Sequence, residues 1–465
     1  MTIDGTAHTA AATLDVVNPA TGAVFAQAPD CSAEQLDAAF ASAARAFATW
    51  RRDEGARRDM LRAAAKALTA RTDDIALLLT TEQGKPLAEA AGEVRSVAAW
   101  LTYYADLDIP REVIRDDKRG FAEVVRRPIG PVAAITPWNY PLTLAFWKLA
   151  PALRAGNTVV LKPSPYTPLS TLLVGAILRD VLPPGVVNTV SGGDRLGAWM
   201  TAHPLARKIS FTGSVETGKR VAAAAAPDLK RLTLELGGND AAIVLDDADI
   251  PAIADKLFWG AFANNGQVCS AVKRVYVPRP LHDDLVDALA ERAASVRVGD
   301  GTADGVRLGP VNNRPQFERV SDLVTDALAH GATAAAGGHP LELGDGCGYF
   351  YAPTILTGVD ENTRVVAEEQ FGPALPVLPY TDLDDAVERV NAGHFGLGGS
   401  VWSADPDRAS DVAARLDVGT AWVNTHLALA PAQPFGGAKW SGLGVENGPW
   451  GLYGFTELQV IHRAR

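Results

Sequence analysis

Short apolar segments rich in β-branched residues alternate with helical stretches through the middle of the chain. Helical stretches such as 171–181 separate the expected strands, which cover residues 132–135, 158–161, 186–190, 208–211 and 232–236. Strands that are apolar on both faces are typical of a parallel sheet covered by helices on each side. A second set of strands and helices begins near residue 241 and includes 273–277, 282–296 and 420–424. The sequence therefore predicts an α/β protein with a doubly wound, Rossmann-like parallel sheet and a second α/β unit.

The flanking segments have simpler patterns. Residues 1–15 are polar and predict a mobile arm. Ser32 and Gln35 form a capping box ahead of a helix that reaches Trp50, and helical spacing continues to about residue 105. Residues 119–127 predict an exposed strand, and 458–461 predict a strand near the C-terminus.

Size and charge exclude several classes of function. A chain of 465 residues exceeds what one hydrophobic core usually serves, so two or three domains are expected. The net charge of −11 argues against a nucleic-acid or anionic-membrane surface. No run of about 18 or more apolar residues predicts a membrane span, and the first residues lack the pattern of a signal peptide.

The cysteine and histidine contents bear on compartment and metals. Cys31, Cys269 and Cys347 are odd in number and widely spaced, which suits a reducing compartment and predicts a cytoplasmic protein. The eight histidines show no metal-ligand spacing, so no metal site is expected.

Cys269 lies in the segment Gly266-Gln267-Val268-Cys269-Ser270, between an expected helix and an expected strand. A loop between two regular elements can expose a reactive side chain while its backbone is held. A thiolate in such a place can attack a carbonyl carbon. A lone cysteine can equally be a small, inert hydrophobe in the core.

Glycines and a lysine follow two of the expected strands. Residues 211–218, with Gly213 and Gly218, follow a strand and open a helix, so they could hold a phosphate at the helix N-terminus or form a plain tight turn. Lys162 ends another strand, where open sheets bind ligands, although a surface lysine capping the strand is the alternative.

Polar residues at three other places could take part in chemistry. Asn139 stands between two prolines in 137–141 and could donate to an oxyanion or belong to a turn. Glu235 lies in an apolar strand, where burial would raise its pKa toward that of a general base, unless it reaches solvent. Glu368 and Glu369 precede an aromatic residue and a turn that could simply be a solvated loop.

Together these motifs resemble the aldehyde dehydrogenase superfamily, in whose order they occur. They are PWNYP at 137–141, KPSP at 162–165, FTGSVETG at 211–218, LELGG at 234–238, GQVC at 266–269, EEQFGP at 368–373 and PFGGAKWSG at 434–442. The resemblance covers the chain after about residue 14. It implies three parts: a cofactor-binding domain (1–107 and 129–237), a catalytic domain (238–445) and a small β oligomerisation element (108–128 and 446–465).

The resemblance also assigns roles to residues. Cys269 is expected to be the nucleophile, Glu235 the general base, and Asn139 an oxyanion donor together with the backbone N–H of Cys269. The cofactor is expected to contact Ile135, Thr136, Pro137, Trp138, Lys162, Ser164, Gly213, Ser214, Leu236, Glu369 and Phe371. An aldehyde is expected to contact Tyr140, Leu144, Trp147, Ala263, Leu427, Leu429 and Phe435, an apolar lining that favours medium-sized apolar or aromatic aldehydes.

The implied reaction is NAD(P)-dependent oxidation of an aldehyde to a carboxylic acid through a thioester on Cys269. A CoA-acylating dehydrogenase is one alternative, but its members generally lack a glutamate where Glu235 stands. A non-catalytic protein on the same fold is another, against which the set of Cys269, Glu235 and Asn139 argues. Many NAD-using members have Glu at the position of Pro165, where it bonds the ribose hydroxyls. Because this carboxylate is missing here, NAD is expected with NADP also accepted. A homodimer or homotetramer is expected, because edge strands expose unpaired backbone groups.

Overall fold

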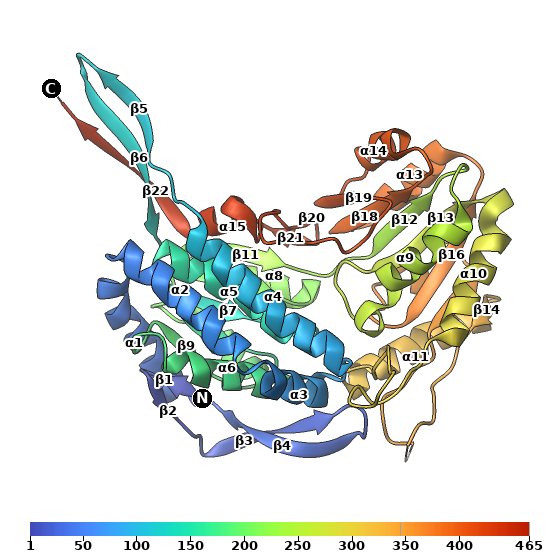
Figure 1. Cartoon of the computed structure of the whole chain (residues 1–465), viewed down its shortest axis with the longest axis horizontal. Helices are drawn as coiled ribbons and strands as arrows, with labels where there is room; N and C mark the ends of the chain where they lie inside the picture. The colour runs from blue at the N-terminus through green and yellow to red at the C-terminus, as the bar shows by residue number, and fades with distance from the viewer. Residues whose placement is uncertain (345, 465) are drawn as a thin grey trace.

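The computed structural model describes residues 1–344 and 346–464, which form two large sheets and a projecting three-stranded arm (Figure 1). The first sheet has the strand order β2-β1-β9-β8-β7-β10-β11-β21, and its strands from β9 to β11 are parallel. Its strands are β1 (Thr2–Ile3), β2 (Thr6–Ala7), β7 (Pro131–Ile135), β8 (Thr158–Lys162), β9 (Val187–Thr189), β10 (Lys208–Thr212), β11 (Arg231–Glu235) and β21 (Gly442–Leu443).

Helices cover both faces of this sheet. In β7, Val132 and Ala134 pack into one hydrophobic cluster, while Ala133 and Ile135 pack into another on the opposite face. Because successive strand residues point to opposite faces, a strand buried on both sides must be apolar throughout. The helices of this half are α1 (Ala33–Trp50), α2 (Glu54–Thr69), α3 (Thr72–Gln83), α4 (Leu87–Asp106), α5 (Pro141–Ala155), α6 (Leu169–Arg179), α7 (Asp194–Ala202) and α8 (Val215–Ala225).

The second sheet has the order β14-β15-β16-β13-β12-β18-β19 and is parallel except for β14. Its strands are β12 (Asp240–Val244), β13 (Val272–Pro278), β14 (Thr333–Ala336), β15 (Thr354–Thr357), β16 (Ala374–Tyr380), β18 (Gly398–Trp402) and β19 (Thr420–Val423). Its helices are α9 (Ile250–Phe262), α10 (His282–Ser295), α11 (Arg314–Ala329), α12 (Arg364–Ala367), α13 (Leu383–Asn391) and α14 (Pro406–Ala413). The predicted α/β class with parallel sheets is confirmed.

The arm is built from segments far apart in the sequence. Strand β6 (Gly120–Pro128) lies between β5 (Glu112–Asp117) and β22 (Thr456–Arg463), with both pairs antiparallel. It projects from the body, and the C-terminus lies near its tip (Figure 1). Exposed apolar side chains occupy its outer strands: Val113, Ile114, Leu458, Val460 and Ile461. The strands expected at 119–127 and 458–461 are therefore present, and they pair with each other. The first is not exposed as predicted, because it lies between the other two strands and most of its residues are buried or half-buried.

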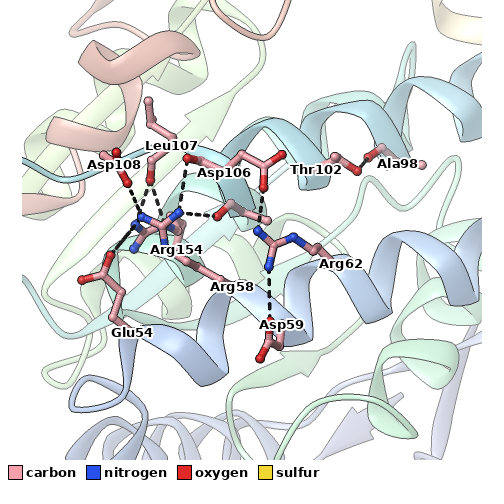
Figure 2. Close-up of polar contacts among 11 residues, drawn as sticks. Glu54, Arg58, Asp59, Arg62, Ala98, Thr102, Asp106, Leu107, Asp108 and Arg154 are labelled. Atoms are coloured by element: carbon pink, nitrogen blue, oxygen red, sulfur yellow. Dashed lines mark hydrogen bonds and ion pairs between the residues drawn. The ribbon is translucent and has the colours of Figure 1, made fainter.

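Arginine side chains fix the root of the arm, where α4 ends. Arg58 donates to the backbone carbonyls of α4's last turn, and Arg154 donates twice to the carbonyl oxygen of Leu107. Arg62 pairs with Asp106 at 2.7 Å. Figure 2 shows these guanidinium groups gathered around the turn between α4 and the arm. The direction in which the arm leaves the body is thus set by many hydrogen bonds.

The N-terminal segment corrects one expectation. Residues 1–15 do not form a free arm, because Thr2 pairs with Thr189 of β9 and the side chain of Ile3 is buried in the core around α1. The next residues enter a hairpin of β3 (Ala12–Asn18) and β4 (Ala23–Asp30). A two-residue strand is too short to show any periodicity, so no sequence pattern predicts it. Within the described part of the chain, no helix has the length and apolarity to cross a bilayer.

Candidate active site

Cys269 lies in a tight turn between α9 and β13. Asn264, Asn265 and Gly266 have φ values of 49°, 58° and 72°, three consecutive residues in the left-handed region. Asparagine and glycine tolerate this region best. A side chain in place of Gly266 would strike the carbonyl oxygen of Gly372, so the turn requires glycine there. The turn reverses the chain and leaves Cys269 half-buried where side chains from both sheets meet.

Asn139 is bonded directly to this turn. Its side-chain nitrogen donates to the carbonyl oxygen of Gln267 at 3.0 Å, and its own carbonyl oxygen accepts from Asn264 at 3.0 Å. A carboxamide has two N–H donors, so one is left for another acceptor. The two loops are therefore fixed to each other, with an amide donor beside the cysteine segment.

Glu235 ends β11 and is buried, with 3% of its surface exposed. Neither of its carboxyl oxygens has a hydrogen-bond partner among the described residues. Burial raises the pKa of this carboxyl well above its usual value, the nearby Glu446 carboxylate raises it further, and the Lys148 ammonium opposes both. Lys148 itself donates to Glu446 at 2.6 Å. An unpartnered carboxyl with a raised pKa is suited to take up a proton.

Two cavities meet at Cys269. One has a volume of about 430 Å³ and the other about 410 Å³, and both are lined by Asn139, Leu144 and Cys269. A reactive sulfur at such a junction can contact one molecule from each side.

The larger cavity faces the first sheet, beyond the ends of its strands. Gly213 and Ser214 lie in its wall at the start of α8, and the Ser214 hydroxyl caps that helix by accepting from the N–H of Thr217. The N-terminus of a helix favours a phosphate. The remaining expected residues in this wall are Pro137, Trp138, Leu236, Glu369 and Phe371.

Two of these side chains are held in place. Glu369 accepts from the N–H of Gly238 at 2.9 Å, and a side chain in place of Gly237 would strike its carboxylate. Phe371 meets Trp138 edge to face, with 5.2 Å between ring centres. The cavity thus offers a carboxylate, aromatic rings and a helix N-terminus, which fit the ribose, nicotinamide and pyrophosphate of a dinucleotide.

Four residues expected at the cofactor lie outside this wall. Ile135 ends β7 and Lys162 ends β8, at the same edge of the sheet, and Thr136 and Ser164 follow these strands. The hydroxyl of Thr136 is buried and has no partner within the described residues. Burial lowers the pKa of Lys162 to about 8. These positions lie at the carboxyl ends of neighbouring parallel strands, where open sheets bind ligands.

The smaller cavity is largely apolar. It contains all the residues expected at the aldehyde: Tyr140, Leu144, Trp147, Ala263, Leu427, Leu429 and Phe435. Trp147 stacks with Trp100 and meets Phe435 edge to face, which fixes its ring. No lysine or arginine is part of this wall within the described residues.

One wall of this cavity was missed by the sequence reasoning. Helix α4 contributes Glu89, Gly92, Glu93, Ser96 and Trp100. Their spacing of three or four residues places them on one helix face. The sequence signal for this wall was a row of small and polar residues on one helix face. Residues at the same spacing also occur on solvent-exposed helix faces, so the signal did not distinguish the two. Gln316 and Arg319 of α11 were likewise missed in the larger cavity.

The surroundings of Cys269 disfavour its charged form. Burial raises the pKa of the thiol above its usual range, and the carboxylates of Asp240, Glu235 and Glu369 raise it further. The proton must therefore leave as the sulfur attacks.

Comparisons with known proteins agree with this geometry. Residues 6–461 match the aldehyde dehydrogenase family. The chain is 40% identical to aminoaldehyde dehydrogenase 2 of Zea mays and to betaine aldehyde dehydrogenase 1 of Oryza sativa subsp. japonica, covering 96% of this chain and 91% of each relative. The NAD⁺ complex of an aldehyde dehydrogenase from Bacillus cereus superposes with a TM-score of 0.97 at 35% identity, covering 100% of this chain and 96% of that one.

Proposed function

Because this chain belongs to the aldehyde dehydrogenase family and is an NAD(P)-dependent aldehyde-oxidising enzyme, we propose that Cys269 is its nucleophile and Glu235 its general base. The observation that supports these roles is the meeting of the two cavities at Cys269. The aldehyde would enter from the apolar cavity and the dinucleotide from the other. Glu235 would serve as base from the end of the strand beside them.

In the first half-reaction, the sulfur of Cys269 bonds to the aldehyde carbon and its proton passes to a base. The developing oxyanion accepts from the Asn139 amide and from the backbone N–H of Cys269. Each donor of this kind is typically worth about 10²–10³ in rate. Glu369, Phe371 and the start of α8 would hold NAD, which would supply the acceptor for the hydride.

In the second half-reaction, Glu235 removes a proton from water, which attacks the thioester on Cys269 and releases the carboxylic acid. A general base in this step is typically worth about 10²–10⁴. The presence of Glu235 favours hydrolysis over acyl transfer to CoA, since a base that activates water is needed only for hydrolysis. The test is NADH formation with and without CoA, and acceleration of steady-state turnover by CoA would contradict the hydrolytic assignment.

We propose that the substrate is a medium-sized apolar or aromatic aldehyde. The wall of Tyr140, Trp147, Leu429 and Phe435 offers apolar contacts but no cation for an anionic tail. An aldehyde with an ammonium tail is the second candidate, because Glu89 lies in the same wall beside these rings. The relatives named for aminoaldehyde and betaine aldehyde agree with that second candidate. A panel of hexanal, benzaldehyde, 4-aminobutanal and succinic semialdehyde would rank them.

We also propose how the chain is divided and assembled. The cofactor-binding domain would comprise 1–107 and 129–237, the catalytic domain 238–445, and the oligomerisation element 108–128 and 446–465. The exposed edges and apolar side chains of the arm support a homodimer or homotetramer in which a second copy covers them. A single monomeric species in sedimentation at micromolar concentration would contradict this assembly. A cytoplasmic location is proposed from the sparse cysteines.

A further inference from the structure

A buried lysine lies directly behind the loop that presents Asn139. Lys85 follows α3, and its ammonium donates to the carboxylate of Glu93 at 2.6 Å and to the carbonyl oxygen of Asn139 at 2.9 Å. The side chain of Lys85 is 0% exposed and that of Glu93 is 1% exposed. The ammonium therefore makes its contacts inside the protein, at the base of the Asn139 loop.

Glu93 links this lysine to the helix that follows Asn139. Its other carboxyl oxygen accepts from the backbone N–H groups of Leu142 and Thr143, both at 2.9 Å. These groups belong to the first turn of α5, where N–H groups have no partner within the helix. One carboxylate thus holds the start of α5, while the ammonium bound to it holds the residue two positions before that helix.

The same ammonium supports the wall of the apolar cavity. It lies 3.6 Å from the ring centre of Tyr140, a distance at which a cation is attracted to an aromatic face. Tyr140 lines the cavity next to Asn139. Lys85 therefore contacts the backbone of the expected oxyanion donor and the side chain of the next residue.

The carbonyl oxygen of Asn139 has a second donor, Asn264, from the cysteine turn. With donors on both sides, this peptide has little freedom to rotate or shift. Oxyanion stabilisation depends on donors held in advance, within a fraction of an ångström, where charge will develop. A misplacement of 1 Å typically costs about 10²-fold in rate.

We infer that Lys85, paired with Glu93, is a positioning residue for the oxyanion donor Asn139. The inference rests on the proposed role of Asn139. A buried ion pair is weak evidence for stability, because its desolvation cost can exceed its Coulombic gain. The position of this pair, between the start of α5 and the carbonyl of Asn139, gives it a function in catalysis instead.

The test compares Lys85→Met with Lys230→Met in the full-length enzyme. Lys230 is a matched control, because its equally buried ammonium also donates to two backbone carbonyls, those of Thr201 and His203, away from both cavities. We expect Lys85→Met to lower kcat by about 10-fold to 100-fold, and to leave the Kd of NADH within about twofold. Lys230→Met should keep kcat within about threefold of the wild type.

A double-mutant cycle with Asn139→Ala separates positioning from general damage. If Lys85 acts through Asn139, Lys85→Met should lower kcat by less than about threefold in the Asn139→Ala background. An equal loss in both backgrounds would overturn the inference, as would a loss in Lys85→Met no larger than in Lys230→Met. Where Lys85→Met does not fold, Glu93→Gln replaces it in the cycle with the same expectations.

Asn139→Ala alone tests the proposed role on which the inference rests. A kcat within about threefold of the wild type would remove Asn139 from the oxyanion site, and the inference would fall with it. A large loss in Asn139→Ala with no loss in Lys85→Met would instead keep the proposed function and reject Lys85 alone.

Discussion

The two cavities that meet at Cys269 are built in different ways. The cofactor side is formed mainly by loops that follow strands of the first sheet, with glycines where the chains approach closely and a helix N-terminus at Ser214. The aldehyde side takes one wall from side chains on the faces of α4 and α5, and loop residues supply the rest. The first wall depends on backbone geometry that few residue types allow. The second depends on the size of side chains that could change without altering the fold.

This difference explains which parts the sequence reveals. A loop that needs glycine or asparagine at fixed positions leaves a motif, whereas a helix face leaves only a spacing shared with every core helix. Loop motifs can therefore be recognised in a sequence of this kind, whereas the wall supplied by Glu89, Gly92, Glu93, Ser96 and Trp100 of α4 cannot.

The largest effect is expected at the junction itself. Cys269→Ala should abolish aldehyde oxidation, because neither cavity offers another nucleophile at their meeting point. Cys31→Ala and Cys347→Ala serve as controls and should keep turnover, since Cys31 is buried in the core and Cys347 lies on the surface. Steady-state NADH formation measures all three. Retention of as much as about one tenth of wild-type kcat in Cys269→Ala would contradict covalent catalysis.

The next effect separates the two half-reactions. Glu235→Gln should lower steady-state kcat by about 10²–10⁴, because water then attacks the thioester without a base. The acyl group should accumulate on Cys269, which mass spectrometry of the intact protein would detect as a mass increase. The same loss of turnover without any acyl adduct would place Glu235 in the first half-reaction instead.

The third prediction concerns the proton on the nucleophile. Because burial and neighbouring carboxylates raise the pKa of the Cys269 thiol, its thiolate fraction should rise about tenfold per pH unit through the neutral range. Alkylation by iodoacetamide, followed by mass spectrometry of the Cys269 peptide, measures this slope between about pH 6 and 8. A rate that levels off near pH 7 would show that the thiol is already ionised there.

A substitution of Asp240 should change the pH dependence of Cys269 alkylation. Among the charged neighbours that raise the pKa of Cys269, Asp240 has the largest effect. Asp240→Asn keeps an oxygen to accept from the N–H of Gly398, which it now does at 3.0 Å, while the charge is removed. Burial raises the pKa of Asp240 to about 8, so most of its charge is present only above that pH. Alkylation of Cys269 at about pH 9 should therefore become faster in this variant. An unchanged rate would mean that the Asp240 carboxyl is uncharged there already.

A smaller effect is expected in the aldehyde wall. Hexanal and benzaldehyde should exceed succinic semialdehyde by about tenfold or more in kcat/KM, because the wall has carboxylates and rings but no cation. Introducing a cation with Ser96→Arg, on the inward face of α4, should narrow this ratio. A wild-type preference for succinic semialdehyde would overturn the reading of this wall.

The smallest effect concerns the cofactor wall and the loop after β8. Pro165 offers neither a hydrogen bond to the ribose hydroxyls of NAD nor a charge against the phosphate of NADP. Discrimination against NADP should therefore stay below about a hundredfold, and Pro165→Glu should widen it by about tenfold, mainly by weakening NADP. The measurement is kcat/KM with both cofactors. A wild-type enzyme that already rejects NADP by about a thousandfold or more would place discrimination elsewhere.

The sequence predicted the parallel strands well for a physical reason. Strands β7, β8 and β10 are buried on both faces, so their apolar runs begin and end within a residue or two of the observed bounds. It failed at Ile3, whose two-residue strand carries no pattern. The sequence also did not predict the contacts of Lys85, which stands in Gly84-Lys85-Pro86, a pattern typical of a turn. Only the fold brings its ammonium to Asn139, 54 positions away.

The last segment of the chain combines two tasks. Glu446 accepts from Lys148 beneath Glu235, Asn447 accepts from the indole of Trp100, and the carbonyl of Phe455 accepts from Asn157. Strand β22 of the arm begins one residue later, at Thr456. The stretch that enters the arm therefore also carries the carboxylate that raises the pKa of Glu235.

Substitutions between Glu446 and Phe455 are constrained at one end by the position of Glu446 and at the other by the start of the arm. If a second copy covers the arm as proposed, a substitution at that contact that moves β22 would also move the helix α15 (Gly448–Tyr453) and the carboxylate of Glu446. Insertions and deletions should therefore be tolerated at the outer end of β22 and in the turn between β5 and β6, but not between Glu446 and Phe455. Sequence changes that alter the proposed oligomeric assembly would then occur first at the tip of the arm and leave its root unchanged.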